Sequence, residues 1–214
     1  MKRILLLLSA AASFVSFGSA GASAHPHVWV TVKSELVYAP DGALAAVQHH
    51  WTFDEMFSTF ATQGLDTNND GKFSREELQG LAEVNVSSLK EFAYFTHPRA
   101  DGKKFTLADP KDYWLEHKDG ALTLNFTLPV QTPLKAKAVE IDVFDGTYFV
   151  DFSLAKGEAV SLVSAPAQCK LAVSKPGGGT PTASQPLSES YFNNLDPNAN
   201  FGARFANKIA VNCP

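Results

Sequence analysis

Alternating hydrophobic and polar residues predict β-strands along most of the chain. Residues 28–33 and 44–53 alternate with a period of two, which is typical of strands that bury one face. Residues 39–42 (Ala-Pro-Asp-Gly) lie between them and are typical of a turn, so the two segments are predicted to form a hairpin. Further short β-branched or aromatic runs, separated by Asp-Gly, Lys-Gly or Pro, occupy residues 105–107, 113–116, 122–128, 139–144, 148–154 and 159–163.

Between the hairpin and the later strands the pattern changes to helical spacing. Residues 52–55 (Thr-Phe-Asp-Glu) match a capping box at the start of a helix, with Trp51 placed to pack on Met56. Residues 74–77 (Ser-Arg-Glu-Glu) match a second capping box, followed at helical spacing by the apolar residues Leu78, Leu81 and Ala82. The chain is therefore predicted to be an α+β protein, a sandwich-like antiparallel β domain with an inserted helix-loop-helix at residues 53–95.

The segment between the two predicted helices matches the calcium-binding loop of an EF-hand. Such a loop needs oxygen ligands at positions 1, 3 and 5, glycine at 6, a backbone carbonyl at 7, a ligand or water at 9 and a bidentate glutamate at 12. Those positions are held by Asp66, Asn68, Asp70, Gly71, Lys72 (through its backbone carbonyl), Ser74 and Glu77. A bound Ca²⁺ would convert the mutual repulsion of the three carboxylates into attraction. The alternative is an acidic turn, which Asp, Asn and Gly favour without any metal.

The residues flanking this loop support an EF-hand. The entering helix should bury apolar residues one, five, six and nine places before Asp66, and those places hold Leu65, Ala61, Phe60 and Phe57. One departure lies in the exit helix, where Asn85 replaces the usual apolar residue. The loop occurs once, whereas calcium sensors usually pair two such loops through position 8, here Phe73. We therefore expect calcium to stabilise the fold rather than to regulate it.

The first 24 residues are predicted to be a cleavable signal peptide. Lys2 and Arg3 are followed by an apolar stretch that begins at Ile4 and runs to about Phe17, and residues 22–24 (Ala-Ser-Ala) form a small-residue cleavage site. This stretch is too short and too interrupted to span a bilayer, and no later apolar stretch is long enough either. We therefore expect a periplasmic protein that does not span the membrane once processed.

The predicted mature chain is acidic. Loss of Lys2 and Arg3 leaves 16 of the 18 basic residues against 22 acidic ones, a net charge of −6. This balance argues against nucleic acid or an anionic membrane surface as a partner.

The two cysteines, Cys169 and Cys213, are predicted to form one disulfide, because the expected compartment is oxidising. In the chain-entropy model, closing this loop of about 43 residues stabilises the fold by roughly 3–4 kcal/mol. A thiolate metal site is the alternative, but no histidine lies near either cysteine in the sequence. Residues 25–173 are predicted to form the β domain. Residues 174–214 are predicted to be a Gly/Pro-rich loop and an irregular C-terminal arm tied by the disulfide.

Cleavage after residue 24 would make His25 the first residue of the mature protein. Its α-amine and imidazole could then chelate one metal ion, and His27 could supply a third nitrogen ligand. Such a donor set suits Cu²⁺, Ni²⁺ or Zn²⁺ rather than Ca²⁺. Pro26 disfavours the amino-terminal copper/nickel chelate that uses a backbone amide, because proline has no amide proton, but the His25 chelate does not need one. The alternative is that residues 25–27 are a polar lead-in to the first strand.

The other four histidines are expected to be structural or solvated. His49 and His50 should point to opposite faces of one strand, so at most one can join a given site. A histidine beside Trp51 is more often a partly buried, hydrogen-bonded residue than a ligand. His97 and His117 are expected in solvated turns.

The order of these motifs resembles the domain-of-unknown-function 1007 family of exported bacterial proteins. The resemblance covers residues 25–169 and rests on the segments 25–28, 51–55, 66–77, 94–96, 126–129 and 145–150, and on a cysteine soon after residues 165–166. Members often have proline where this chain has Gly146, which concerns only a turn. The family has no established biochemical activity. Its members are often encoded beside nickel/cobalt-type permeases, which implies a part in handling a transition metal such as Ni²⁺, Co²⁺, Zn²⁺ or Cu²⁺, with an inner-membrane metal permease as partner.

Three functions follow from these observations. The first is a calcium-stabilised accessory in transition-metal handling, and the second is a calcium-stabilised protein-interaction module that binds no transition metal. The third, a copper-dependent enzyme using the N-terminal histidine, is the least favoured. The sequence has no Gly-x-Ser-x-Gly elbow, no His-Glu-x-x-His helix and no cysteine beside a histidine. We therefore expect a binding protein rather than an enzyme.

Overall fold

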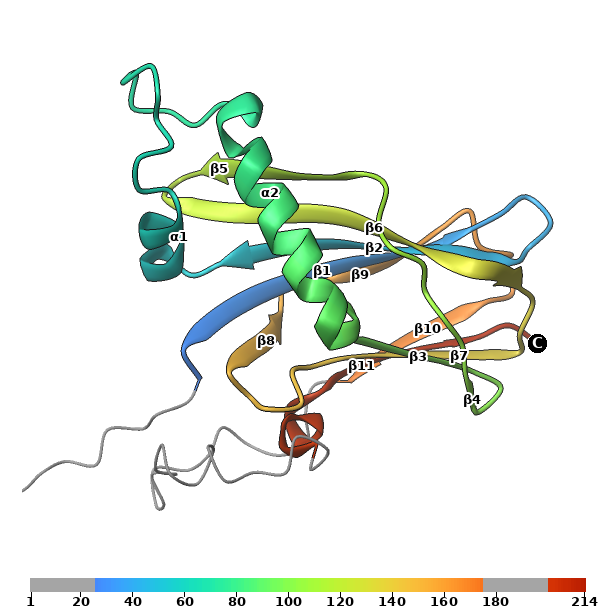
Figure 1. Cartoon of the computed structure of the whole chain (residues 1–214). Coiled ribbons are helices and arrows are strands. Elements are labelled where there is room, and N and C mark those ends of the chain that lie inside the picture. Colours follow the sequence, from blue (N-terminus) through green and yellow to red (C-terminus); the bar gives the residue numbers. More distant parts are fainter. Residues whose placement is uncertain (1–25, 175–199) are drawn as a thin grey trace, which may run out of the picture.

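The computed structural model describes residues 26–174 and 200–214, which fold into two β-sheets with helices packed at one side (Figure 1). The predicted signal peptide, His25 and most of the Gly/Pro-rich stretch lie outside the described residues. The first sheet contains β1 (Val28–Tyr38), β2 (Leu44–Phe53), β5 (Tyr113–Lys118), β6 (Ala121–Leu134), β8 (Val150–Leu154) and β9 (Val160–Val163). The second contains β3 (Thr96–Ala100), β4 (Lys103–Lys104), β7 (Ala138–Val143), β10 (Lys170–Ser174) and β11 (Asn207–Asn212). The helices are α1 (Glu55–Ala61) and α2 (Arg75–Leu89), with 3₁₀ segments η1 (Lys90–Phe95) and η2 (Phe201–Phe205).

The first sheet is mixed, with the order β5-β6-β2-β1-β8 and with β9 also paired to β1. The predicted β1–β2 hairpin is confirmed, with antiparallel pairing from Val30 and Phe53 to Tyr38 and Leu44. The prediction of a purely antiparallel domain is wrong, because β8 and β9 pair with β1 in parallel. After β6 the chain passes through β7 in the second sheet and returns to the free edge of β1. A return of this kind is a crossover, and crossovers allow parallel pairing whereas a tight hairpin does not.

The second sheet is antiparallel throughout its order β10-β11-β7-β3-β4. Two sequence predictions are wrong here. His97 and Pro98 lie in β3 rather than in a turn, paired with Asp142 and Ile141 of β7. The tail after residue 206 is not irregular, because it forms β11 between β10 and β7.

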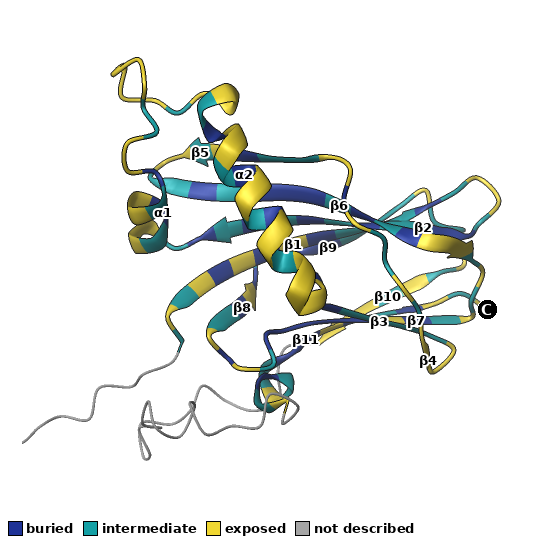
Figure 2. Cartoon of the chain, in the orientation of Figure 1, coloured by how far each residue is buried: buried dark blue, intermediate teal, exposed yellow. Residues whose placement is uncertain are grey.

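The core fills the space between the sheets and continues under α2. Fully buried side chains come from both sheets, among them Leu36, Val47, Trp51, Phe126, Ile141 and Ile209. Helix α2 buries Leu78, Ala82 and Val86 and leaves its opposite face exposed, as the colours of Figure 2 show. Its first residue, Arg75, lies over the ring of Trp114 in β5 at 4.6 Å, which fixes the start of the helix against the sheet edge. None of the described helices is long and apolar enough to cross a membrane.

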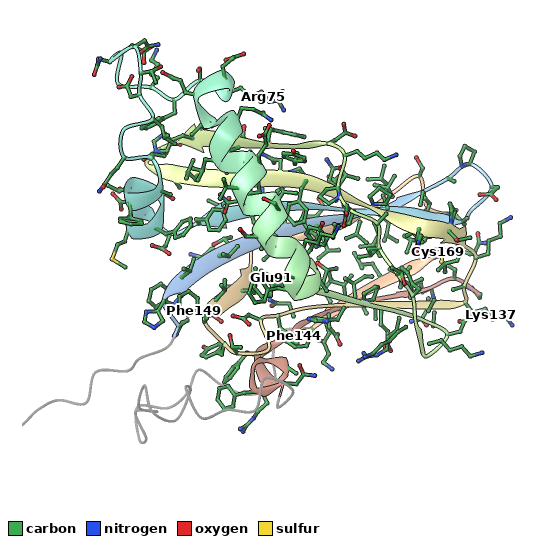
Figure 3. All side chains as sticks on the ribbon, in the orientation of Figure 1. Arg75, Glu91, Lys137, Phe144, Phe149 and Cys169 are labelled. Atoms are coloured by element: carbon green, nitrogen blue, oxygen red, sulfur yellow. A yellow bond between two sulfur atoms is a disulfide. The ribbon has the colours of Figure 1, made fainter. Side chains whose placement is uncertain are left out.

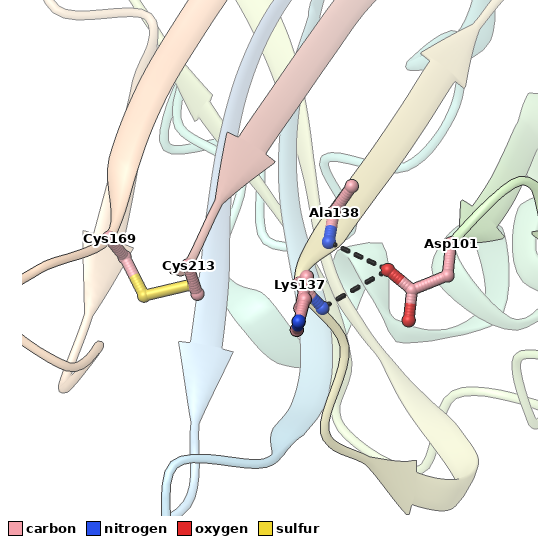
Figure 4. The surroundings of a disulfide bond; sticks show 5 residues. All are labelled: Asp101, Lys137, Ala138, Cys169 and Cys213. Atoms are coloured by element: carbon pink, nitrogen blue, oxygen red, sulfur yellow. Dashed lines mark hydrogen bonds between the residues drawn. A yellow bond between two sulfur atoms is a disulfide. The ribbon is translucent and has the colours of Figure 1, made fainter.

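The predicted disulfide between Cys169 and Cys213 is confirmed (Figure 4). It joins the chain just before β10 to the residue just after β11. Beside it, the Cys213 N–H donates to the Lys137 carbonyl at 2.7 Å, and Asp101 Oδ1 accepts the N–H groups of Lys137 and Ala138 at 3.1 and 2.9 Å. The C-terminal strand is therefore tied both covalently and by hydrogen bonds. A disulfide in the fold is compatible with export.

The helical insertion differs from the prediction at its start. Strand β2 continues to Phe53, so the N-cap of α1 is Asp54, whose carboxylate accepts the Phe57 N–H at 2.9 Å, and residues 52–55 form no capping box. Trp51 is buried in β2 while Met56 is 69% exposed, so the expected contact between them is absent. Thr52 stays in β2 instead of capping the helix, because it pairs with β1 on one side and with β6 on the other.

Candidate functional site

The candidate calcium loop is held in shape by its own polar side chains. The Asp66 carboxylate accepts the N–H groups of Asp70 and Gly71 at 3.1 and 3.0 Å. Asn68 Oδ1 also accepts the Asp70 N–H at 2.9 Å, and Asp70 Oδ1 accepts the Lys72 N–H at 2.8 Å. The backbone turns sharply at Gly71, whose φ of 75° favours glycine. The side chains of Asp66, Asn68 and Asp70 thus accept the backbone N–H groups of residues 70–72, around the turn at Gly71.

Glu77 joins the two ends of the loop and begins α2. Its Oε1 accepts the N–H and the hydroxyl of Thr67, each at 2.8 Å, and its Oε2 accepts the Ser74 N–H at 2.8 Å. Ser74 Oγ accepts the Glu77 N–H at 3.2 Å, so the predicted capping box at residues 74–77 is confirmed. The hydrogen bonds from the Ser74 backbone and from Thr67 lower the pKa of Glu77 to about 2. This carboxylate is therefore charged at any ordinary pH.

The entering side of the loop is less like an EF-hand. Helix α1 ends at Ala61, five residues before Asp66, and the chain reaches the loop through a turn. Phe57 and Leu65 pack against the core as predicted, but Phe60 is 71% exposed. Thr62 is the C-cap of this short helix, and both its backbone N–H and its hydroxyl donate to the Ser58 carbonyl, at 3.2 and 2.9 Å.

The loop carboxylates are not gathered into a preformed cluster. Within residues 26–174 and 200–214, no group of three or more His, Cys, Asp or Glu side chains is placed to hold a metal ion. Both Glu77 oxygens are occupied by N–H and O–H donors of the loop. The donor set has the hard oxygens that Ca²⁺ prefers, and binding would require Glu77 to exchange at least its Thr67 contacts for the ion.

Phe73, at loop position 8, packs on the β-domain. Its ring meets the ring of His117 in β5 edge-on at 4.8 Å between centroids. In paired EF-hands this position contacts a second loop, whereas here it covers a strand. This contact also means that His117 is half-buried rather than fully solvated, in contrast to the prediction.

His27 lies at the exposed start of β1. Its backbone N–H donates to the Phe149 carbonyl at 2.9 Å, and its imidazole stacks on the Phe149 ring at 4.7 Å between centroids. Figure 3 shows Phe149 beside the first residues of β1. Its expected partner, His25, lies outside the described residues, so the N-terminal pair remains a prediction.

His49 and His50 point to opposite faces of β2, as predicted. His49 is fully buried between the sheets, where Thr96 Oγ1 donates to the Tyr94 carbonyl and therefore accepts from His49 Nε2 at 3.2 Å. Nδ1 then accepts the hydroxyl of Ser34 at 2.8 Å. Burial, with a smaller contribution from the charge of His50, lowers the pKa of His49 to about 3. This histidine is a neutral core residue, not a ligand.

His97 is held in the second sheet, although we expected it to be solvated. Its ring stacks on Phe144 at 4.1 Å, and Nε2 is 3.3 Å from the Phe144 carbonyl. Burial lowers the pKa of His97. Figure 3 marks Phe144, which follows β7 directly.

A polar chain on the outer face of the first sheet was not predicted. Asn125 Nδ2 donates to Glu116 at 3.2 Å, which leaves Asn125 Oδ1 to accept from His50 Nδ1 at 2.5 Å. These residues lie on β2, β5 and β6 in a groove of about 490 Å³ that also contains Lys33 and Glu158. Strand alternation places His50 outward, but its partners depend on the β2–β6 register, which the sequence does not specify.

The comparison with known proteins decides the family. A family model described as "Protein of unknown function (DUF1007)" matches residues 10–213. The chain belongs to the DUF1007 family. Among its relatives, an uncharacterized protein of Haemophilus influenzae is 26% identical over 217 residues and spans the whole of both chains. An uncharacterized 15.5 kDa protein from the trpE 3′ region of Spirochaeta aurantia is 35% identical over 98 residues, which cover 45% of this chain and 70% of that protein.

The segment 145–150 of this DUF1007 protein forms a tight turn around a buried carboxylate. Asp145 is 4% exposed and accepts the N–H and hydroxyl of Thr147 and the N–H of Val150, at 2.9 to 3.1 Å. Asp145 is therefore a turn residue. The turn places Phe149 next to His27 and leads directly into β8.

Proposed function

We propose that this DUF1007 protein is a calcium-binding protein of the periplasm, with the ion held by the loop from Asp66 to Glu77. The observation that carries the proposal is the complete set of oxygen donors at EF-hand spacing, followed at once by a capped helix. Asp66, Asn68, Asp70, Ser74 and Glu77 would supply side-chain oxygens, and Lys72 its backbone carbonyl. The bound ion would supply positive charge that neutralises the three carboxylates.

The loop is suited to weak, structural binding. Asn68, Asp70 and Ser74 are exposed, and Asp66 and Glu77 are only half-buried. Glu77 must also leave hydrogen bonds to bind. Extracellular EF-hand modules bind calcium at about 10⁻⁴ to 10⁻³ M. At ten times the dissociation constant, calcium would add about 1.4 kcal/mol to the free energy of unfolding. For a chain of this size that corresponds to a rise of about 3–6 °C in melting temperature.

Isosteric substitutions test the calcium proposal by thermal unfolding with and without calcium. Asp66→Asn and Glu77→Gln each keep one of the two oxygens that accept from the loop and remove the charge that the ion needs. We expect both variants to melt somewhat below the wild type in chelator, because an NH2 group replaces one acceptor, and to lose the rise in melting temperature caused by calcium. Glu76→Gln is the matched control, because Glu76 is a neighbouring exposed carboxylate in the same helical turn. Equal calcium responses in wild type, Asp66→Asn and Glu77→Gln would refute the loop assignment.

We further propose that the protein serves as an accessory in transition-metal handling, with His25 and His27 as ligands and an inner-membrane metal permease as partner. The supporting observation is that His27 is exposed at the start of β1 and fixed there by Phe149. A metal held at this end of the strand would be accessible to another protein. The net negative charge of the processed chain also suits a carrier of cations and disfavours nucleic acid as a partner.

The proposed metal site at His25 and His27 is tested by adding one residue before His25, which moves the α-amine away from the His25 imidazole. Protein beginning at His25 should bind one Cu²⁺ or Ni²⁺ tightly, measured by isothermal titration calorimetry. Adding a single glycine before His25 should weaken that binding at least tenfold, because the amine can no longer close the same chelate. His117→Gln is a control that should leave binding unchanged. If the added glycine has no effect on stoichiometry or affinity, the amine is not a ligand.

A further inference from the structure

We propose that an aromatic pocket beside α2 binds a small, largely apolar or aromatic molecule that carries a hydrogen-bonding group such as a hydroxyl. The pocket has a volume of about 500 Å³ and lies between α1, α2, the first sheet and the turn at residues 145–150. This inference does not depend on calcium binding or on the N-terminal histidines.

The walls of the pocket are mostly aromatic. Trp51, Phe53 and Phe152 come from the first sheet, Phe57 from α1, and Phe92 from η1. Phe149 lines the side nearest the start of β1, where Figure 3 shows it. A volume of a few hundred cubic ångströms with apolar walls and a few polar groups is typical of small-molecule sites.

One buried donor in the wall has no partner. Trp51 is 1% exposed, and its indole Nε1 is one of two buried side-chain polar atoms that lack a hydrogen bond within the described part of the chain. Tryptophan N–H groups normally find an acceptor when buried, because an unpaired buried donor is costly. The Nε1 atom is fully buried, so an oxygen in the pocket cannot reach it, and Trp51 serves here only as a reporter of what enters the pocket.

Two polar side chains of α2 face the same pocket. Asn85 uses its amide Nδ2 to donate to the Leu81 carbonyl at 2.8 Å, so its Oδ1 can accept a bond from a ligand. Ser88 lies at the exposed mouth. Asn85 replaces the apolar residue that the helical pattern favours, which the calcium loop does not explain. Asp145 also lines the pocket, but its carboxylate already accepts from Thr147 and Val150.

The mouth of the pocket leaves aromatic surface in contact with water. Phe92 and Phe149 are 47% and 45% exposed, although both belong to the pocket wall. A ligand hydroxyl can donate to Asn85 Oδ1 while its ring covers these phenylalanines. We therefore commit to a small aromatic alcohol or a molecule of similar chemistry.

The probes are p-cresol and its isostere p-xylene, in which a methyl group replaces the hydroxyl. The chain has three tryptophans, so its ¹H–¹⁵N spectrum should contain three indole signals. Trp29→Phe and Trp114→Phe assign two of them, and the remaining one belongs to Trp51, without any substitution in the core. We expect p-cresol at up to millimolar concentration to shift the Trp51 signal saturably, and p-xylene to produce less than half of that shift.

A matched pair of variants locates the binding. Ser88→Phe places a ring in the mouth of the pocket and should weaken p-cresol binding at least fivefold. Ser87→Phe adds the same ring one residue earlier, outside the lining, and should leave binding unchanged. The proposal is overturned if the Trp51 signal does not respond saturably to p-cresol, if both variants bind alike, or if p-xylene gives an equal shift. It is also overturned if dilution of the protein alone produces the same shift, since a second copy would then be the occupant.

Discussion

At the scale of single residues, His49 shows how one buried side chain can make stability depend on pH. It joins β2 of the first sheet to Thr96 of the second through its neutral imidazole, and its pKa is lowered to about 3 from the ordinary value of 6.5. Between those two values the unfolded chain binds a proton that the folded chain excludes. Stability is therefore fully present above pH 6.5 and is lost as the pH falls, by up to about 1.4 kcal/mol per pH unit.

Denaturant unfolding at pH 7 and pH 5 measures this contribution. We expect the wild type to lose about 2 kcal/mol of unfolding free energy from this residue over that range. His49→Gln keeps a group that can bond to Ser34 and Thr96 but cannot titrate, so its loss should be smaller by about that amount. His117→Gln, which removes a half-buried imidazole from β5, is the matched comparison. Identical slopes for wild type and His49→Gln would contradict the assignment of a neutral buried imidazole.

At the scale of elements, the C-terminal segment depends on a close backbone contact. Gly202 in η2 donates its N–H to the Gly146 carbonyl at 2.9 Å, and a Cβ added at Gly202 would lie 1.6 Å from the Asp145 carbonyl oxygen. Tyr148 stacks on Phe205 at 4.2 Å next to this contact. The glycine is thus required by space rather than by backbone conformation.

The substitution Gly202→Ala should therefore be strongly destabilising. Because the clashing atoms are backbone, relief requires moving η2 or the 145–150 turn, at about 3 kcal/mol. This corresponds to a fall of about 6–12 °C in melting temperature, measured by calorimetry. Gly80→Ala is the control, since a Cβ at that position of α2 meets nothing within 4 Å and alanine favours helix. A Gly202→Ala protein that melts within 1–2 °C of the wild type would show that the packing of η2 on the turn is wrong.

The elements also show which features the sequence could predict. The β1–β2 hairpin and the capping box at residues 74–77 depend on residues close in sequence, and both were predicted correctly. The parallel pairing of β8 with β1 depends on a crossover through the second sheet, which no local pattern encodes. The start of α1 was placed wrongly because Thr52 satisfies both a capping pattern and a strand pattern, and its neighbours in the sheet decide between them.

The same distinction holds for the candidate sites. The candidate calcium loop is a contiguous motif, so it could be proposed without knowledge of the fold. The aromatic pocket draws on β2, α1, α2, η1 and β8, and only the fold brings those residues together. Asn85 was a detectable signal, because it interrupts the apolar face of α2 at the position that lines the pocket.

At the scale of the whole molecule, α2 connects the candidate calcium loop to the core and to the pocket. Its first turn contains Glu77, its middle buries Leu78 and Ala82, and its last turns contribute Asn85 and Ser88 to the pocket. Ordering of the loop by calcium would therefore stabilise a helix that covers the core. The single loop, attached to a disulfide-tied β-sandwich, favours a supporting role for calcium.

The most direct test of this account is the stoichiometry of calcium binding to metal-free protein, measured by isothermal titration calorimetry. We predict one Ca²⁺ per chain with a dissociation constant of about 10⁻⁴ to 10⁻³ M. Binding should be lost in Glu77→Gln and retained in Glu76→Gln. No binding by the wild type at several times that concentration, or equal binding by Glu77→Gln, would contradict the proposal that the Asp66 to Glu77 loop holds calcium.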